Sequence, residues 1–164
     1  MKKILSFILC IILSLSLFAC GEKKGYKDDV SCAEILDTAE EQIPIDGGYG
    51  ELGGSHIKYN FADTELDDDH AFRHSKLSED INEFGIFHAP DEKAKRELKE
   101  LTENYLAQLL EEKGEFISSY APKELEKLKN AETRVIGNYV AYAILSKDDR
   151  ALFFDTVEKM LSKQ

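Results

Sequence analysis

The chain contains no apolar run long enough to cross a membrane and too few basic residues to coat a nucleic acid. The longest mostly apolar run, 4–18, has 15 residues, whereas a transmembrane helix needs about 20. Its 164 residues include 21 lysines and arginines against 32 aspartates and glutamates, a formal net charge of −11. Proteins that bind a phosphate backbone have the opposite balance. We therefore expect neither a transmembrane helix nor a nucleic-acid partner.

The first twenty residues have the pattern of a bacterial lipoprotein signal. Lys2 and Lys3 precede the apolar run, and the sequence Leu17-Phe18-Ala19-Cys20 spans its end. An ordinary secretory site has small residues in an A-x-A-like pattern, which Leu17 does not fit, whereas a lipoprotein site has Leu, a tolerant position, a small residue and Cys. We expect residues 1–19 to be a signal peptide that is removed. Lipid on Cys20, with two acyl chains, would then hold the protein at the extracytoplasmic face of the cell membrane.

Cysteine is scarce, and the predicted processing leaves little of it. Of three cysteines, Cys10 would leave with the signal and Cys20 would carry lipid, so Cys32 would have no partner for an internal disulfide. Loss of two lysines and no acid would take the formal charge from −11 to −13, which favours a soluble, acidic surface. We expect residues 20–30 to be the lipidated Cys and a flexible tether. Residues 31–164 would form a single α+β domain, long enough to bury its own core.

Three segments have helical patterns. Ser31 and Glu34 form a capping box at the start of a helix that runs to about residue 42. Asp91 precedes a long stripe of apolar residues at helical spacing, and Pro122 opens a short helix after it. A last helix is expected to begin with Asp148 or Asp149 as its cap. The glycine-rich segment 47–54 is interpreted as a loop.

Strand patterns are strongest in the second half of the chain. The segment 83–89 (EFGIFHA) and the two β-rich runs around Gly137-Asn138 predict three strands, and 70–76 is a possible fourth. Together with the helices they predict an α+β fold: an antiparallel sheet of three to four strands, with the long helix and the C-terminal helix packed on one face.

No motif predicts a catalytic or cofactor site. The 48–53 segment fits G-x-G-x-x-G but does not lead into a helix, so we predict no cofactor. His70 and His74 are four residues apart and would share a zinc ion only on a helix; on a strand they would lie about 13 Å apart. Because their surroundings do not favour a helix, we predict no metal and keep these two histidines as the candidate ligands if one exists.

The second half of the chain resembles a known family. The matching residues are Glu83 and Phe87 in EFGIFHA, Tyr120-Ala-Pro122-Lys-Glu124, Leu128-Lys-Asn130-Ala131 and Gly137-Asn138-Tyr139-Val140. They resemble a domain of unknown function found in small lipoproteins of Gram-positive anaerobes. The resemblance implies lipid-anchored surface proteins without an assigned activity, so no catalytic residue is carried over. Among the matching residues, Glu83, Tyr120 and Tyr139 are our candidates for binding a partner.

These observations lead to one main expectation and two alternatives. The main expectation is a non-enzymatic envelope lipoprotein that acts as a binding or accessory module for an envelope protein or polymer. The first alternative is an envelope hydrolase or transferase, with a metal at His70 and His74. The second is a surface receptor for a small ligand or cation, which requires a pocket.

Overall fold

The chain folds into helices and strands in the computed structural model, which describes residues 25–54, 59–61 and 69–163. The predicted signal and Cys20 lie outside these residues. The elements are α2 (Cys32–Gln42), β1 (Tyr49–Glu51), β2 (His70–Ser75), β3 (Glu83–His88), α4 (Glu92–Tyr120), α5 (Pro122–Lys129), β4 (Glu132–Ile136), β5 (Tyr139–Ile144) and α6 (Lys147–Leu161). The predicted α+β class is confirmed. No helix in the described ranges is both long and apolar enough to span a bilayer.

The sheet has five strands in the order β1-β2-β3-β5-β4, and every neighbouring pair is antiparallel. This is more than the three to four strands predicted, because β1 lies inside the glycine-rich segment that was interpreted as a loop. Gly47 and Gly48 have positive φ angles of 76° and 72° and form the turn before β1. Tyr49 then anchors the strand, since its ring packs edge-on against Phe84 with the centroids 5.0 Å apart.

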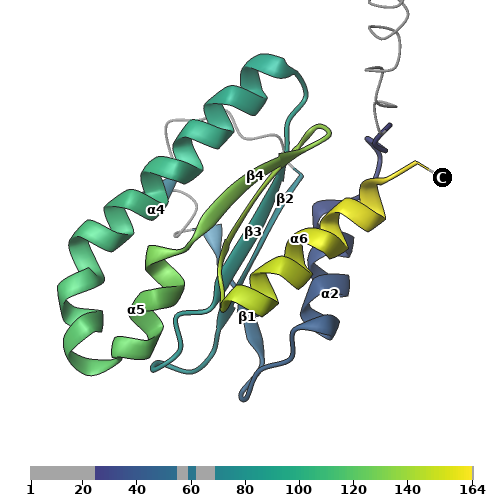
Figure 1. The fold of residues 1–164 in the computed structure, drawn as a ribbon. Helices are drawn as coiled ribbons and strands as arrows, with labels where there is room; N and C mark the ends of the chain where they lie inside the picture. The colour runs from purple at the N-terminus through teal and green to yellow at the C-terminus, as the bar shows by residue number, and fades with distance from the viewer. Residues whose placement is uncertain (1–24, 55–58, 62–68, 164) are drawn as a thin grey trace, which may run out of the picture.

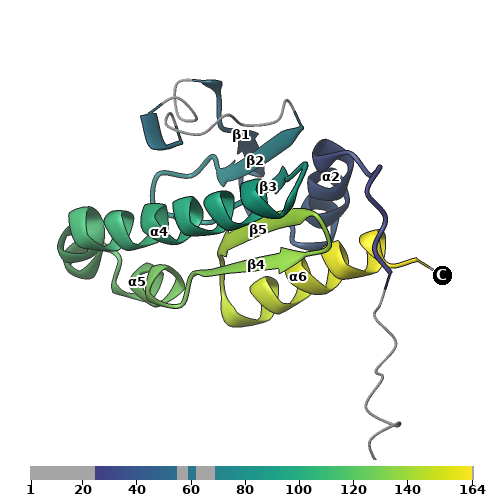
Figure 2. The same cartoon turned by 90° about the horizontal axis from the view of Figure 1, so that it is seen from above.

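Helices cover both faces of the sheet, which corrects the prediction that they share one. Figures 1 and 2 show α4 and α5 on one side of the strands and α2 and α6 on the other. All six residues of β5 are buried. Alternate residues contact the two cores, with Tyr139, Ala141 and Ala143 facing α2 and α6, and Val140, Tyr142 and Ile144 facing α4 and α5. A strand that is apolar on both faces requires cover on both.

The helix starts follow local capping chemistry. The Ser31 hydroxyl accepts from the backbone N–H of Glu34 at 3.2 Å, and Asp91 Oδ1 accepts from that of Ala94 at 2.8 Å, as the sequence predicts. Helix α6 differs, because its N-cap is Ser146 and not one of the two aspartates that follow. Helix α4 continues to Tyr120 and therefore reaches the far end of the sheet, where α5 turns back against it (Figure 1).

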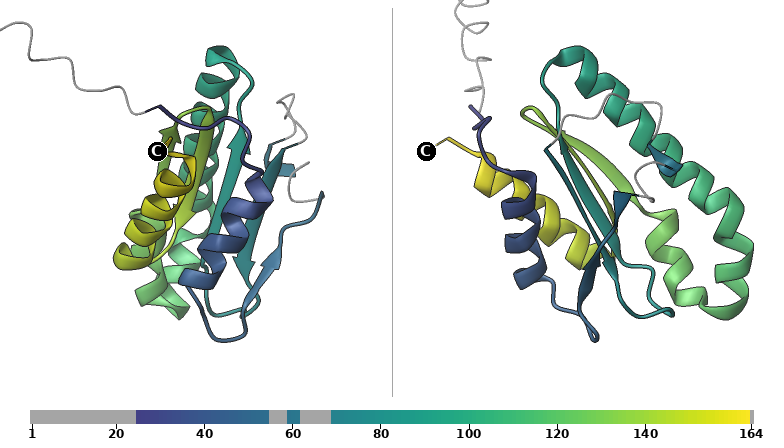
Figure 3. Two further views of the ribbon diagram at one scale, coloured as in Figure 1. Left: turned by 90° about the vertical axis from the view of Figure 1, so that its right-hand side faces the viewer. Right: turned by 180° about the vertical axis from the view of Figure 1, so that it is seen from behind.

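Residues 25–30, which were expected to belong to the tether, pack against the domain. The backbone N–H of Lys27 donates to the carbonyl of Leu161 at 2.7 Å, so this segment runs beside the end of α6 (Figure 3). The Tyr139 hydroxyl donates to the Val30 carbonyl at 2.7 Å and accepts from the Val30 N–H at 3.2 Å. Among the described residues, packing against the domain therefore extends back to Gly25.

Candidate ligand-binding cleft

The three residues predicted to bind a partner lie in different places. Tyr139 faces α2 and α6 and is 1% exposed, so its role is to hold the N-terminal segment. Tyr120 is 77% exposed at the end of α4, where its ring lies 4.7 Å from that of Phe116. Glu83 lies at the start of β3 on the opposite face from Tyr139 and lines a cleft. The structure therefore does not bring the three together.

The two candidate metal ligands lie on one strand. His70 and His74 are both in β2, four residues apart, where about 3.3 Å per residue separates them too far for one ion. Across the described ranges, no group of three or more His, Cys, Asp or Glu side chains is arranged to hold a metal. The His74 ring lies over β1, with Nε2 3.0 Å from the position that a Cβ on Gly50 would occupy.

Glu83 is held in place by two tyrosines from different elements. The hydroxyls of Tyr105, on α4, and Tyr142, on β5, both donate to its Oε1, at 2.8 Å and 2.7 Å. Its other oxygen, Oε2, makes no hydrogen bond with the residues that the structure describes. The carboxylate is half-buried. Within the described residues, the protein therefore fixes one oxygen of Glu83 and not the other.

The two tyrosines are buried and remain protonated. Tyr142 is fully buried and Tyr105 is 7% exposed. Burial, followed by the negative charge of Glu83 and the hydrogen bond to it, raises the pKa of Tyr105, and burial and the Glu83 charge likewise raise the pKa of Tyr142. A protonated phenol is a permanent donor toward a carboxylate, so the pair keeps Glu83 in one orientation.

Gly85 allows Tyr142 to reach Glu83. In the sheet Tyr142 lies opposite Gly85, two residues along β3 from the glutamate. A Cβ on Gly85 would lie 2.6 Å from both the Tyr142 ring and the Phe72 ring, which is closer than such atoms approach. The missing side chain thus leaves room for the Tyr142 ring to cross β3. Phe61 packs on Tyr105, with ring centroids 5.1 Å apart.

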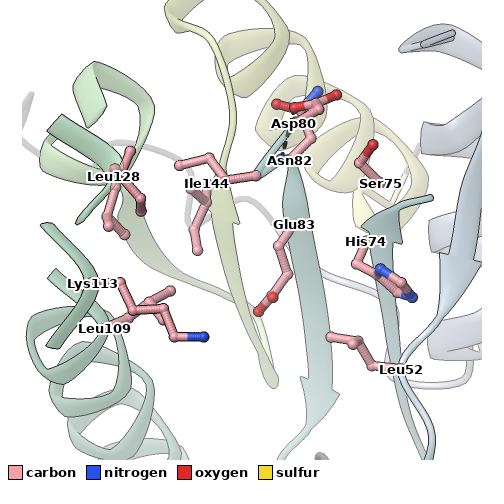
Figure 4. Close-up of a pocket in the computed structure, with 12 residues that line it drawn as sticks. Leu52, His74, Ser75, Asp80, Asn82, Glu83, Leu109, Lys113, Leu128 and Ile144 are labelled. Atoms are coloured by element: carbon pink, nitrogen blue, oxygen red, sulfur yellow. Dashed lines mark hydrogen bonds between the residues drawn. The ribbon is translucent and has the colours of Figure 1, made fainter. Parts of the chain in front are cut away.

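The cleft beside Glu83 has a volume of about 200 Å³. Figure 4 shows that the Lys113 amine, from α4, and the Glu83 carboxylate, from β3, extend into the same space. The His74 ring, in contrast, is turned away from Glu83 in this view. Apolar side chains form most of the remaining wall: Leu52, Ile81, Leu109, Ile117, Leu128 and Ile144.

A compact ion cluster includes Asp80, which lines the cleft. Lys127 Nζ lies 3.0 Å from Asp80 Oδ1 and 2.7 Å from Glu124 Oε2. Burial acts to raise the pKa of Asp80, but hydrogen bonds from Lys127 and the Asn82 backbone outweigh it, so the pKa lies below its usual value. Burial acts to lower the pKa of Lys127, but its two carboxylate partners raise it overall. The single lysine charge is shared by two carboxylates, and the cluster tethers α5 to the β2–β3 connection.

Comparison with protein families places most of this cleft in a known domain. Residues 55–145, more than half of the chain, match a family described as a domain of unknown function, DUF4358. The chain belongs to the DUF4358 family. Searches of curated proteins and of solved structures give no match. The DUF4358 region contains Glu83, Tyr105, Lys113 and Tyr142, and it leaves out α2, α6 and the N-terminal segment.

Sequence reasoning finds only part of the DUF4358 cleft. Glu83 stands out as a polar residue in an aromatic strand, but Tyr105 is hidden in the apolar stripe of α4 and Lys113 among its charged residues. The face on which Tyr142 lies could have been predicted, because successive residues of a strand point to opposite faces and Tyr142 is three residues from Tyr139. The tyrosines converge on one oxygen only through the pairing of β3 with β5.

Proposed function

We propose that this DUF4358 protein is a lipid-anchored, extracytoplasmic binding module whose binding site is the Glu83 cleft. The observation that carries the proposal is the uneven hydrogen bonding of the Glu83 carboxylate. Its Oε1 accepts from two buried tyrosine hydroxyls, while Oε2 has no partner among the described residues and Glu83 lines the cleft. A carboxylate oriented in advance loses little freedom when it binds, which favours recognition of a ligand. The partner would be an envelope protein or polymer, or a small molecule at the cell surface.

The position of the N-terminal segment supports this arrangement. Asp28 accepts a hydrogen bond from Asn138 at 2.9 Å and lies 2.9 Å from His88 Nε2, at the end of β3. Glu83 lies at the start of the same strand, about 17 Å away at roughly 3.3 Å per residue. A lipid on Cys20 would therefore approach the domain at the end opposite the cleft, and the cleft would point away from the membrane.

The role of a small-ligand receptor is compatible with the same geometry, because the cleft supplies the pocket that this role requires. The metal-assisted hydrolase receives less support. His70 and His74 occupy a strand rather than one face of a helix, and the His74 ring leans over Gly50 rather than toward Glu83. We therefore propose binding without catalysis as the role of the cleft.

The anchor is tested by Cys20→Ser. We expect wild-type protein to incorporate labelled palmitate and to sediment with membranes, and the variant to lose both properties. Cys10→Ser is the matched control, since it lies in the predicted signal. Unchanged labelling and retention of Cys20→Ser would show that lipid on this cysteine does not hold the protein.

Binding at the cleft is tested by photo-crosslinking in cells. A photoreactive residue at Leu52, in the cleft wall, should form a discrete adduct, and the adduct should disappear in a Glu83→Gln background. The same residue at Leu152, which is 36% exposed on α6, is the matched control. An adduct equally strong from both positions, or independent of Glu83, would argue against the cleft as the binding site.

A further inference from the structure

The cleft holds two opposite charges that are not paired with each other. Neither Glu83 nor Lys113 forms an ion pair with any residue that the structure describes, although both line the same space. Lys127, in contrast, is paired with both Asp80 and Glu124. The carboxylate and the amine therefore face the cleft from β3 and α4 as separate positions for charge.

The two positions differ in character. Glu83 is half-buried and fixed by Tyr105 and Tyr142, whereas Lys113 is exposed and approaches on a flexible side chain. A rigid, partly desolvated carboxylate is suited to an ammonium group, because a charge-assisted hydrogen bond there is stronger than one in open water. A mobile lysine at the rim can follow a carboxylate that extends toward solvent.

The size and the wall of the cleft limit what lies between these charges. Its volume of about 200 Å³ is below the roughly 300–1,000 Å³ of sites that enclose drug-sized molecules. The wall is built mainly by leucine and isoleucine side chains from α4, α5 and β5, together with Leu52 and Ile81. A ligand that fits all three features is small and carries an ammonium, a carboxylate and an apolar group.

We infer that the cleft binds a free amino acid with an apolar side chain. Its ammonium donates to Glu83 Oε2, its carboxylate pairs with Lys113, and its side chain packs on the apolar wall. The inference rests on the proposed binding role of the cleft and gives that role a ligand class. It requires no chemical change in the ligand.

Calorimetric titration of the full-length protein in detergent, with L-leucine and two part-ligands, tests this inference. Isoamylamine keeps the amine and the branched chain, and isocaproate keeps the carboxylate and the branched chain. We expect saturable binding of leucine and at least about tenfold weaker binding of each part-ligand, since a hydrogen bond to a charged group contributes about 1.5–3 kcal/mol. Glu83→Gln and Lys113→Met should each weaken leucine binding at least about tenfold.

One test variant and one control variant separate an effect on binding from an effect on folding. Lys113 is exposed, so Lys113→Met tests recognition without disturbing the core. Glu111→Gln changes a nearby exposed charge on α4 that does not line the cleft and should leave leucine binding unchanged. Absence of leucine binding, equal affinity for isoamylamine, or an unaffected Lys113→Met variant would overturn the inference.

Failure of this inference is distinguishable from failure of the proposed function. A Glu83-dependent adduct from Leu52 together with no leucine binding would mean that the cleft binds another ligand class. Leucine binding that depends on both charges would support the inference even if no macromolecular adduct formed.

Discussion

The hydroxyl of Tyr142 donates to Oε1 of Glu83 at 2.7 Å, although the two residues are not opposite each other in the sheet. The contact exists because the residue that does face Tyr142 is Gly85. Stability and titration behaviour in this protein are therefore connected through one short stretch of β3.

Removing either phenol hydroxyl should destabilise the fold. We expect Tyr105→Phe and Tyr142→Phe each to lower the free energy of unfolding by about 1–3 kcal/mol, because each deletes a hydrogen bond to a half-buried carboxylate. Urea denaturation measures the change. Tyr120→Phe is the matched control, since that side chain is 77% exposed, and it should change stability by less than about 0.5 kcal/mol. An equal loss of unfolding free energy in all three variants would show that the hydrogen bonds to Glu83 do not stabilise the fold.

A methyl group on Gly85 should be poorly tolerated. We expect Gly85→Ala to cost about 1–3 kcal/mol or more, because the new Cβ would lie 2.6 Å from two aromatic rings. Gly53→Ala meets nothing within 4 Å and should be neutral. Thermal unfolding of the two variants compares the sites, and similar midpoints would show that the rings can move away from β3.

The fold should be labile in alkali. The pKa of Tyr49, Tyr105 and Tyr142 is raised above the usual 10.0, in each case chiefly by burial. A raised pKa means that the unfolded state releases the proton first. The stability that these tyrosines contribute is therefore fully present below pH 10.0 and falls as the pH rises above that value. The last rise in tyrosinate absorbance should coincide with the loss of the circular dichroism signal in alkali. Ionisation of these tyrosines before unfolding would contradict their burial.

Asp80 should contribute stability that is lost in acid. Its pKa is lowered from 3.8, so the ionised form is favoured in the folded state, and this stabilisation is present above 3.8 and disappears as the pH falls through the folded value. We expect Asp80→Asn to lower the unfolding midpoint at neutral pH and the difference from wild type to vanish in strong acid. The exposed Asp46→Asn variant is the control and should show no such convergence.

Tyr139 should control the N-terminal segment. Tyr139→Phe deletes both hydrogen bonds to the Val30 backbone, so amide hydrogen exchange in residues 25–30 should accelerate while exchange in β3 and β5 stays slow. Mass spectrometry of peptides from these regions reads out the two responses separately. Unchanged protection of residue 30 against exchange would mean that the other contacts of the segment hold it in place without the Tyr139 hydroxyl.

The helices and the β4–β5 hairpin could be predicted because their signals are local. Ser31, Asp91 and Pro122 mark helix starts through groups within a few residues of each, and Gly137 alone adopts the positive φ of the hairpin turn, at 61°. Strand β1 was missed because its glycines indicate a turn, while the residue that fixes the strand, Tyr49, acts through a distant contact with Phe84.

The distribution of helices between the two faces, and most of the cleft, depended on long-range pairing. A run such as β5, apolar at every position, does not indicate from its own pattern which helix covers which face. Glu83 was recognisable as an unusual residue, but its two donors are 22 and 59 positions away. Only the register of β3 with β5 and the packing of α4 bring them to one oxygen.

The first and last described parts of the chain meet at one corner of the molecule. The backbone N–H of Lys163 donates to the carbonyl of Gly25 at 2.9 Å, and Tyr26 forms a β-bridge with Ser162. A short linker between these positions would give a circular permutant, and new ends opened at Gly53-Gly54 would leave every strand of the sheet uncut. The same adjacency would let the domain be inserted into a surface loop of another protein, with both junctions entering at a single point.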